Sequence, residues 1–158
     1  MRRWFRVANT RPRSGVYAVV AFLLLAQAAS ARAQTVNGVW QQIDPDTGKA
    51  GALVTFTESG GVFSGAFSKL FPDPGDDPNP LCHKCPDGRR DKPLLGLVFI
   101  EGMQRSGLAY EGGTILDPET GTLYSANMQL SGDGNTLEVR GYVGISLFGQ
   151  SQTWKRVK

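Results

Sequence analysis

The stretch TLEVRGYVGISLFGQSQTWKRV, residues 136–157, decides how the chain folds. It contains two strand-like segments, 136–143 and 150–157, and the apolar link between them begins and ends with glycine. Such a link allows the two segments to run back along each other. Gly38-Val39-Trp40 opens the first strand-like segment after residue 33. A closed sheet requires this first strand to pair with the last one.

Residues 1–33 have the composition of an export signal. Arginines cluster at the start, residues 16–29 are apolar, and Ala31-Arg32-Ala33 is a small-x-small cleavage site. The apolar run is too short to span a bilayer, so we expect no membrane anchor. We predict cleavage after Ala33 and a periplasmic or secreted mature chain that forms a single domain, residues 34–158. Arg2-Arg3 is compatible with general or twin-arginine export.

The net charge changes with that cleavage. The full chain has 17 Lys and Arg against 14 Asp and Glu, and six of the basic residues but none of the acidic ones lie in residues 1–33. The mature chain would therefore have 11 basic and 14 acidic side chains, a net charge of −3. Basicity that belongs to an export signal does not indicate a nucleic acid partner, and we expect none.

The rest of the sequence is patterned as short strands separated by turns, without helical periodicity. Residues 124–130 are the clearest strand, because apolar and polar side chains alternate along them. DPDTGK at 44–49 and DPETGT at 117–122 predict the same hairpin turn twice. The predicted strands are 37–43, 52–58, 62–70, 94–101, 110–116, 124–130, 136–143 and 150–157. Eight strands joined by such turns predict an all-β fold, an eight-stranded antiparallel up-and-down β-barrel.

One connection, residues 71–93, is much longer than the others. It is rich in Pro and Asp and contains both cysteines and the only histidine. Loops of this length are usually functional, cross-linked or disordered. The strand predicted after it, 94–101, is apolar almost throughout, which indicates that both of its faces are covered. An apolar strand of this kind also suggests a homodimer that forms through it.

Several motifs, taken in order, resemble those of a known family. They are GVW at 38–40, DPDTGK at 44–49, CHKCPDGRRDKPLLG at 82–96, EGGTILDPETGTLY at 111–124 and LEVRGYVGISLFGQSQTWKR at 137–156. On these motifs the chain closely resembles the bacterial family known as domain of unknown function 2147, which consists of small exported proteins. The resemblance implies a lipocalin-like (calycin) barrel in the cell envelope. It implies no activity, because the family has none assigned.

Gly38-Val39-Trp40 is the place where the likeness to lipocalins can be followed residue by residue. Lipocalins have a Gly-x-Trp motif on the first strand, and its indole packs at the closed end of the barrel against an arginine of the last strand. The resemblance implies that Gly38 and Trp40 belong to this motif and that Arg156 lies over the Trp40 ring as a cation–π contact. Lys155 is the competing candidate.

Cys82-His83-Lys84-Cys85 is the sharpest local signal. After export the two thiols meet an oxidising compartment, which favours a Cys82–Cys85 disulfide that pins the long loop. The Asp- and Pro-rich surroundings disfavour a redox dithiol, and a metal site would need two further ligands from acidic side chains. We interpret His83 as an exposed loop residue and not as a general base.

The charged residues that fall within predicted strands include Glu101, Glu111 and Arg140. A charge inside a small barrel needs a partner or a ligand, and we expect two of the three to point outward. No nucleophile with its base, metal set or phosphate-binding loop is recognisable. We therefore expect a protein that is not an enzyme and has no catalytic residue, cofactor or metal.

The leading hypothesis is a binding module, because an eight-stranded barrel is just wide enough to hold one small ligand. We predict that Phe67, Phe99, Tyr124 and Met128 line a cavity for an apolar or amphipathic molecule. The alternative is a structural or interaction protein of the envelope that has no cavity and uses the strand 94–100 or the long loop as its contact surface.

The parity of the strand 62–70 is open from the sequence. One parity turns small side chains inward, Ser64, Ala66 and Ser68, and the other turns Phe63, Phe67 and Lys69 inward. The first would widen the interior and the second would fill it.

Overall fold

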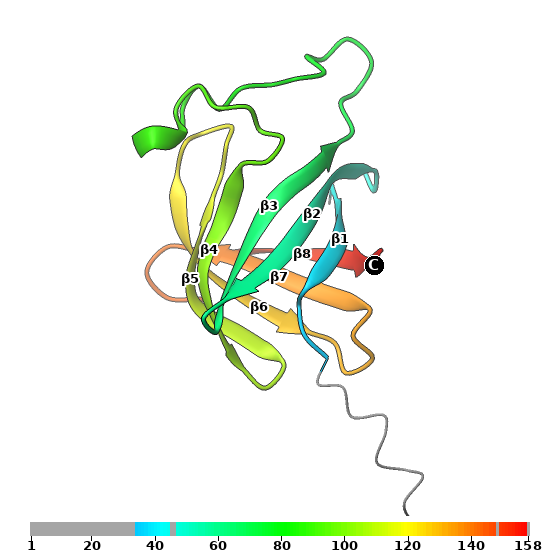
Figure 1. Ribbon diagram of the computed structural model, residues 1–158, viewed down its shortest axis with the longest axis vertical. Helices are drawn as coiled ribbons and strands as arrows, with labels where there is room; N and C mark the ends of the chain where they lie inside the picture. Colours follow the sequence, from blue (N-terminus) through cyan, green and yellow to red (C-terminus); the bar gives the residue numbers. More distant parts are fainter. Residues whose placement is uncertain (1–33, 45–46, 148, 158) are drawn as a thin grey trace, which may run out of the picture. The chain divides into compact units, whose positions relative to one another are not determined.

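The computed structural model describes residues 34–44, 47–147 and 149–157, and the predicted signal peptide lies outside the described residues. Eight antiparallel strands close into a barrel, in which each strand pairs with its neighbours in sequence and β1 pairs with β8 (Figure 1). The strands are β1 (Gly38–Ile43), β2 (Ala50–Ser59), β3 (Val62–Leu70), β4 (Val98–Ser106), β5 (Ala109–Leu116), β6 (Leu123–Leu130), β7 (Thr136–Tyr142) and β8 (Gly149–Arg156). The predicted all-β, eight-stranded up-and-down barrel is confirmed.

Helical structure is minimal in the part of the chain that the structure describes. It amounts to one 3-10 turn, η2 (Asp87–Arg89), within the long connection between β3 and β4. No helix among the described residues is long and apolar enough to cross a membrane. The sheet alone therefore supplies the framework of the protein.

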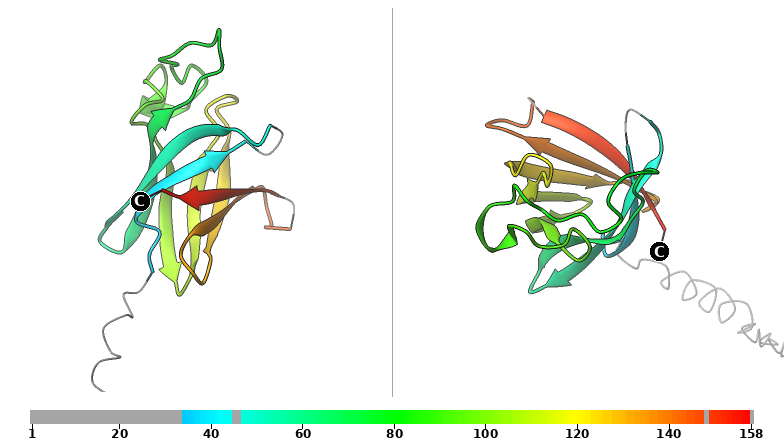
Figure 2. Two further views of the ribbon diagram at one scale, coloured as in Figure 1. Left: turned by 90° about the vertical axis from the view of Figure 1, so that its right-hand side faces the viewer. Right: turned by 90° about the horizontal axis from the view of Figure 1, so that it is seen from above.

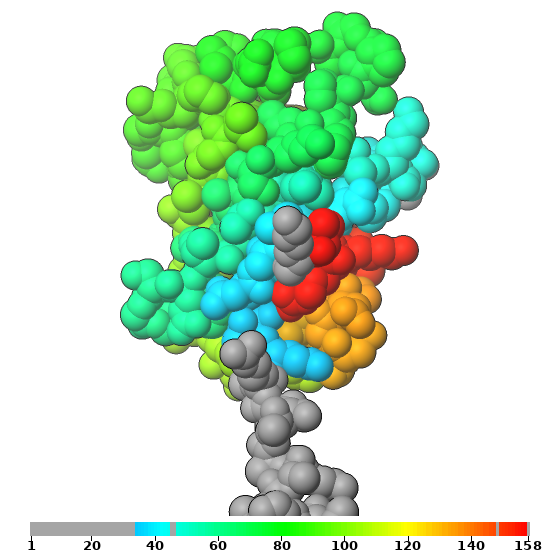
Figure 3. Space-filling view, turned by 45° about the vertical axis from the view of Figure 1, so that its right-hand side comes forward, coloured from blue at the N-terminus to red at the C-terminus, as the bar shows by residue number. Residues whose placement is uncertain are grey.

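The barrel closes where the two ends of the sheet meet. Trp40 pairs with Arg156 and Gln41 with Lys155, so β1 and β8 lie side by side (Figure 3). β7 and β8 pair over their whole lengths, from Thr136 opposite Lys155 to Tyr142 opposite Gly149. The two strand-like segments of residues 136–157 thus form the predicted hairpin and join it to the first strand.

The up-and-down order gives the barrel two different ends. The connections after β1, β3, β5 and β7 lie at one end, which we call the open end, and the long connection 71–97 extends beyond the strands there (Figure 2). The connections after β2, β4 and β6 lie at the opposite, closed end, where residues 34–37 lead into β1 (Figure 1).

Two turns at the open end have the same geometry, as their sequences predict. In the first, the Asp44 carbonyl accepts a hydrogen bond from Gly48 N at 2.9 Å, and Asp44 N donates to the Lys49 carbonyl at 2.8 Å. In the second, Asp117 makes the equivalent bonds to Gly121 N and the Thr122 carbonyl, at 2.8 and 2.9 Å. In each turn the Asp side chain also accepts a bond from a backbone N–H of the turn, which is the usual role of Asp at this position.

The predicted bounds of the fourth strand, 94–101, are wrong. β4 begins at Val98 and ends at Ser106, and residues 94–97 belong to the long connection. Gly96 has φ +86°, a left-handed conformation that interrupts a strand. The apolar character of this segment has another cause, because Leu97 is buried against the core as the end of the loop returns to the barrel.

β3 turns its large side chains inward. Phe63, Gly65 and Phe67 are buried, whereas Ser64 and Ala66 are half-buried and Ser68 is exposed. The register shifts between Leu53 and Val54 of β2, opposite Lys69 and Phe67, so Ser68 is the extra residue of a β-bulge. Lys69 is exposed, with its ammonium 4.8 Å from the centre of the Phe71 ring.

Candidate ligand-binding site

The closed end is sealed by the predicted contact between the first and last strands. Arg156 lies over the Trp40 ring, with the guanidinium carbon 4.2 Å from the ring centre. Trp40 is fully buried, and its Nε1 donates a hydrogen bond to the Val36 carbonyl at 2.7 Å. Lys155, the competing candidate, is exposed and pairs with Gln41. The closed end is therefore a packed plug in which an arginine covers an indole face.

The guanidinium of Arg156 also ties together three stretches of chain. Its Nε donates to the Gly134 carbonyl at 2.6 Å, Nη1 to the Asn37 carbonyl at 2.8 Å and Nη2 to the Thr35 carbonyl at 2.6 Å. Partial burial lowers the pKa of Arg156, but a guanidinium starts so high that it stays charged. One side chain thus fixes residues 34–37 across this end of the barrel.

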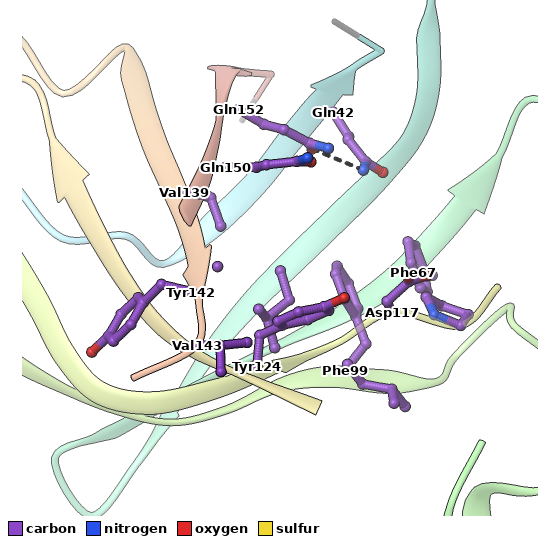
Figure 4. A pocket seen from close by; sticks show the side chains of 14 residues that line it. Gln42, Phe67, Phe99, Asp117, Tyr124, Val139, Tyr142, Val143, Gln150 and Gln152 are labelled. Carbon is purple, nitrogen blue, oxygen red and sulfur yellow. Dashed lines mark hydrogen bonds between the residues drawn. The ribbon is translucent and has the colours of Figure 1, made fainter. Parts of the chain in front are cut away.

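A cavity of about 350 Å³ opens at the other end of the barrel (Figure 4). Its volume lies within the range of roughly 300–1,000 Å³ that is usual for small-molecule pockets. The lining comes from every strand except β2, from the turn after β5 and from the start of the connection after β7. The described residues around it are Gln42, Phe67, Phe99, Ile115, Leu116, Asp117, Pro118, Tyr124, Val139, Gly141, Tyr142, Val143, Gln150 and Gln152.

Aromatic rings form an apolar part of the cavity wall. The Phe67 and Phe99 rings stack with their centres 3.9 Å apart and their planes 6° from parallel. Trp154, which is buried, lies with its ring centre 6.3 Å from that of Phe99 and 6.3 Å from that of Phe56. The stacked Phe67 and Phe99 rings give an apolar ligand a rigid surface to contact.

Amide side chains form a polar patch on the opposite wall. Gln42 of β1 and Gln152 of β8 are joined by a hydrogen bond of 3.1 Å, and Gln150 lies beside them (Figure 4). Trp154 Nε1 donates to the same Gln152 oxygen at 3.1 Å. Tyr124 and Phe99 lie across the cavity from these glutamines (Figure 4). The cavity is therefore amphipathic, with one apolar and one polar side.

Three of the four residues predicted to line a cavity do so, namely Phe67, Phe99 and Tyr124. Met128 does not line it. Met128 is buried deeper, opposite Tyr110 of β5 and Val139 of β7, where it fills the core toward the closed end. Its parity was predicted correctly, but its height along the tilted barrel could not be predicted from the alternation pattern alone.

The three glutamines were missed by the sequence analysis. Gln42 follows Trp40 by two positions and Gln152 precedes Trp154 by two, so each shares the inward parity of a buried tryptophan. That parity is the signal that would have found them. They were passed over because a polar residue in a strand is usually assigned to the solvent face.

The long connection is pinned to the barrel at its cysteine motif. Cys82 and Cys85, both fully buried, are joined by the predicted disulfide, and Cys82 Sγ lies 3.6 Å from the Pro118 carbonyl oxygen. A Cβ on Gly121 would collide with the Lys84 carbonyl, so the motif packs directly on the turn after β5. The disulfide therefore holds the long connection against the turn after β5, at the open end of the barrel.

The remaining charged residues agree with ordinary surface roles. His83 is exposed, with its Nδ1 2.8 Å from Asp91 Oδ1. Glu101 points outward and binds Arg89 of η2 at 3.1 Å, and Glu111 is also exposed. No group of three metal-ligating side chains occurs among the described residues.

Arg140 also points away from the interior, and it holds the connection between β7 and β8. Its Nε and Nη2 donate to the carbonyls of Ser146 and Leu147 at 2.6 and 3.3 Å, and its Nη1 donates to Ser151 at 2.8 Å. Glu101, Glu111 and Arg140 therefore all point outward, whereas the sequence analysis expected this of two of them.

The structure resembles a known solved fold. A structure of a Helicobacter pylori protein that is described as belonging to the lipocalin family matches with a TM-score of 0.67 and 21% sequence identity, over 78% of this chain and 84% of that chain. At this identity the likeness shows the lipocalin-like barrel and nothing about a ligand. No curated protein matches the chain. The model of a family described as uncharacterized proteins conserved in bacteria matches residues 38–156, so the chain belongs to the bacterial family DUF2147.

Proposed function

We propose that the protein is a binding module that holds one small apolar or amphipathic molecule in the cavity at the open end of its barrel. The cavity itself, about 350 Å³ in volume and amphipathic in lining, is the observation that carries the proposal. A barrel that served only as a rigid framework would fill this space with side chains. The half of this barrel toward the closed end is filled in that way, by Met103, Met128 and Leu137.

The shape of the cavity supports an amphipathic occupant. Its apolar wall presents the stacked Phe67 and Phe99 rings, which suit a hydrocarbon tail, and its polar wall presents the Gln42 and Gln152 amides, which suit a hydrogen-bonding head. A purely polar ligand would leave the aromatic wall in contact with water, and a purely apolar ligand would leave the amide groups without hydrogen-bond partners.

A dye titration tests this proposal. N-phenylnaphthylamine, an uncharged dye whose fluorescence rises in apolar surroundings, should bind the protein at one site per chain. Val139→Phe adds a ring to the cavity wall and should weaken dye binding at least about tenfold, since the space for the dye is lost. Thr153→Phe, which adds the same ring to an exposed position of β8, should leave binding unchanged.

The titration separates the proposal from its alternative. Equal dye binding by the Val139→Phe and Thr153→Phe variants, with folding verified by circular dichroism, would show that the dye binds outside the cavity. The protein would then be better explained as an interaction module of the envelope.

That second candidate draws on a different observation, the connection between β7 and β8. Val143, Ile145 and Leu147 are 68%, 58% and 80% exposed, and Leu123 beside the same end is also exposed. Apolar side chains concentrated on one loop are characteristic of contact surfaces. A homodimer through the apolar segment 94–100 has less support, because a closed barrel leaves no free strand edge and residues 94–97 are not a strand.

We further propose that the protein acts in the periplasm or is secreted. The Cys82–Cys85 disulfide supports an oxidising compartment, and the composition of residues 1–33 supports export.

A further inference from the structure

The orientation of the Gln42 and Gln152 amides in the cavity wall is fixed by a tryptophan. An indole N–H can only donate, so Gln152 must present its oxygen to Trp154 Nε1. Gln42 donates to that same oxygen and must therefore use its own NH₂ group. Two side-chain groups then have no hydrogen-bond partner among the described residues. They are the NH₂ group of Gln152 and the side-chain amide oxygen of Gln42. The polar wall thus offers a donor and an acceptor side by side.

No positive charge accompanies this pair of amides. The lining contains no Lys, Arg or His among the described residues, and its one carboxyl group is that of Asp117. Two basic side chains at the open end are engaged elsewhere, since Lys49 pairs with Asp73 at 3.2 Å and Arg140 binds loop carbonyls. An anionic head inside the cavity would therefore lose hydration without gaining a counter-ion.

The carboxylate of Asp117 is already used by its own turn. Its oxygens accept hydrogen bonds from Glu119 N at 2.9 Å and from the Thr120 hydroxyl at 2.7 Å. The carboxylate therefore stabilises the turn. Its negative charge also repels an anionic ligand at the mouth of the cavity.

We propose that the ligand has an uncharged head that both accepts and donates hydrogen bonds, such as a primary amide or a hydroxyl, carried on a hydrocarbon tail. This inference rests on the proposed function and narrows it to neutral amphiphiles. The head accepts from the Gln152 NH₂ group and donates to the Gln42 carbonyl oxygen, while the tail lies against Phe67 and Phe99.

Three probes with the same ten-carbon tail test the inference by displacement of bound N-phenylnaphthylamine at pH 7. Decanamide is neutral, decanoate is anionic and decylammonium is cationic. Decanamide should bind at least about tenfold more tightly than decanoate, because a site built for hydrogen bonds discriminates strongly against a head that leaves its groups unpaired. Decylammonium should also bind more weakly than decanamide, since no lining group is free to neutralise it fully.

The pH dependence gives an independent readout. A carboxylic acid has a pKa of about 4 to 5, so lowering the pH from 7 toward 5 increases the neutral fraction of decanoate. Displacement by decanoate should then strengthen, while displacement by decanamide should stay constant. A constant affinity for decanoate over this range would contradict the inference.

Gln152→Glu tests the assignment of the donor. The variant keeps an oxygen for Trp154 and Gln42 but replaces the free NH₂ group by a charged carboxylate oxygen. The affinity for decanamide should fall about tenfold, and decylammonium should bind more tightly than it does to the original protein. Gln41→Glu makes the same chemical change at a position of β1 that does not line the cavity, and it should leave all three affinities unchanged.

The outcomes distinguish this inference from the proposed function. If the dye fails to bind in the cavity, both are wrong. If the dye binds there but decanoate competes as well as decanamide, or decanamide does not compete, the cavity binds ligands and the inference about the head is wrong. If decylammonium is the best competitor, Asp117 and not the glutamine pair recognises the head, which also overturns the inference.

Discussion

Trp40 should contribute more to the stability of the barrel than any other single residue at the closed end. It is fully buried, it bonds to the Val36 carbonyl, and Arg156 covers its face. Trp40→Ala should lower the free energy of unfolding by about 3 to 5 kcal/mol, because it removes a large aromatic side chain and leaves a cavity. Urea denaturation with an unchanged slope checks this value.

Arg156 should contribute less than Trp40 but more than an isolated cation–π contact would. Arg156→Ala removes the ring contact and leaves three carbonyl oxygens without their donor, a loss of roughly 1.5 to 3 kcal/mol. Arg156→Lys keeps the charge but cannot reach three carbonyls at once, so it should recover only part of that loss. If Arg156→Lys restored the full stability, the positive charge and not the three N–H donors of the guanidinium would account for the contribution of Arg156.

The contact between Trp40 and Arg156 could be predicted because the resemblance to lipocalins points to both residues. No such resemblance marks the glutamines, and glutamine is common on exposed strand faces. Only their spacing from Trp40 and Trp154 marks Gln42 and Gln152 as inward-facing, and that requires the parity of both tryptophans to be known first.

At the scale of elements, the two Asp-Pro-acid-Thr-Gly turns provide a matched experiment. Gly48 and Gly121 have similar left-handed conformations, φ +69° and +75°, but only Gly121 faces another segment, at the Lys84 carbonyl. Gly48→Ala should cost about 1 to 2 kcal/mol through backbone strain alone. Gly121→Ala should cost more and should also release the cysteine motif from the turn.

Trypsin reports that release. The long connection contains three trypsin sites, Lys84, Arg89 and Arg90, so detachment of the motif should accelerate cleavage there in the Gly121→Ala variant and not in the Gly48→Ala variant. Equal cleavage rates in the two variants would show that the motif does not depend on the turn.

The disulfide should stabilise the long connection and not the barrel. It closes a ring of only four residues, Cys82 to Cys85, so its effect on the unfolded chain is small compared with that of a long-range bridge. Replacement of both cysteines by serine should leave the β-sheet circular dichroism signal intact and increase trypsin cleavage after Lys84. A thiol assay of the exported protein under denaturing conditions should detect no free thiol.

The start of β4 was the element least accessible to sequence reasoning. Residues 94–100 form one apolar run, and such a run is compatible with a buried strand or with a loop end packed on the core. The conformation of Gly96 and the burial of Leu97 decide between them, and both depend on tertiary contacts. The turn residues, by contrast, determine their own local geometry, which is why both Asp-Pro turns were predicted.

At the scale of the whole molecule, strand number and closure could be predicted but the interior could not. Eight strands fix the diameter of a barrel, but whether its centre is filled depends on the height of each side chain along the tilted strands. Met128 lies toward the closed end and fills the core, while Val139 and Gly141 line the cavity. The cavity is therefore a property of three-dimensional packing that the alternation pattern does not encode.

The export proposal makes a prediction about the whole chain. When the full sequence is expressed in a bacterium, the protein recovered from the periplasm or the medium should have lost residues 1–33, and its intact mass should correspond to a chain that begins at Gln34. Recovery of the uncleaved chain from the cytoplasm alone would contradict export.

The proposed amphipathic ligand would lie in the open-end cavity, between its aromatic and amide walls. The most direct test is a crystal structure of residues 34–158 grown with decanamide. We expect one molecule in the cavity, with its tail against Phe67 and Phe99 and its amide group within hydrogen-bonding distance of Gln42 and Gln152. A cavity that contains only solvent at saturating decanamide, or decanamide bound elsewhere on the surface, would contradict this expectation.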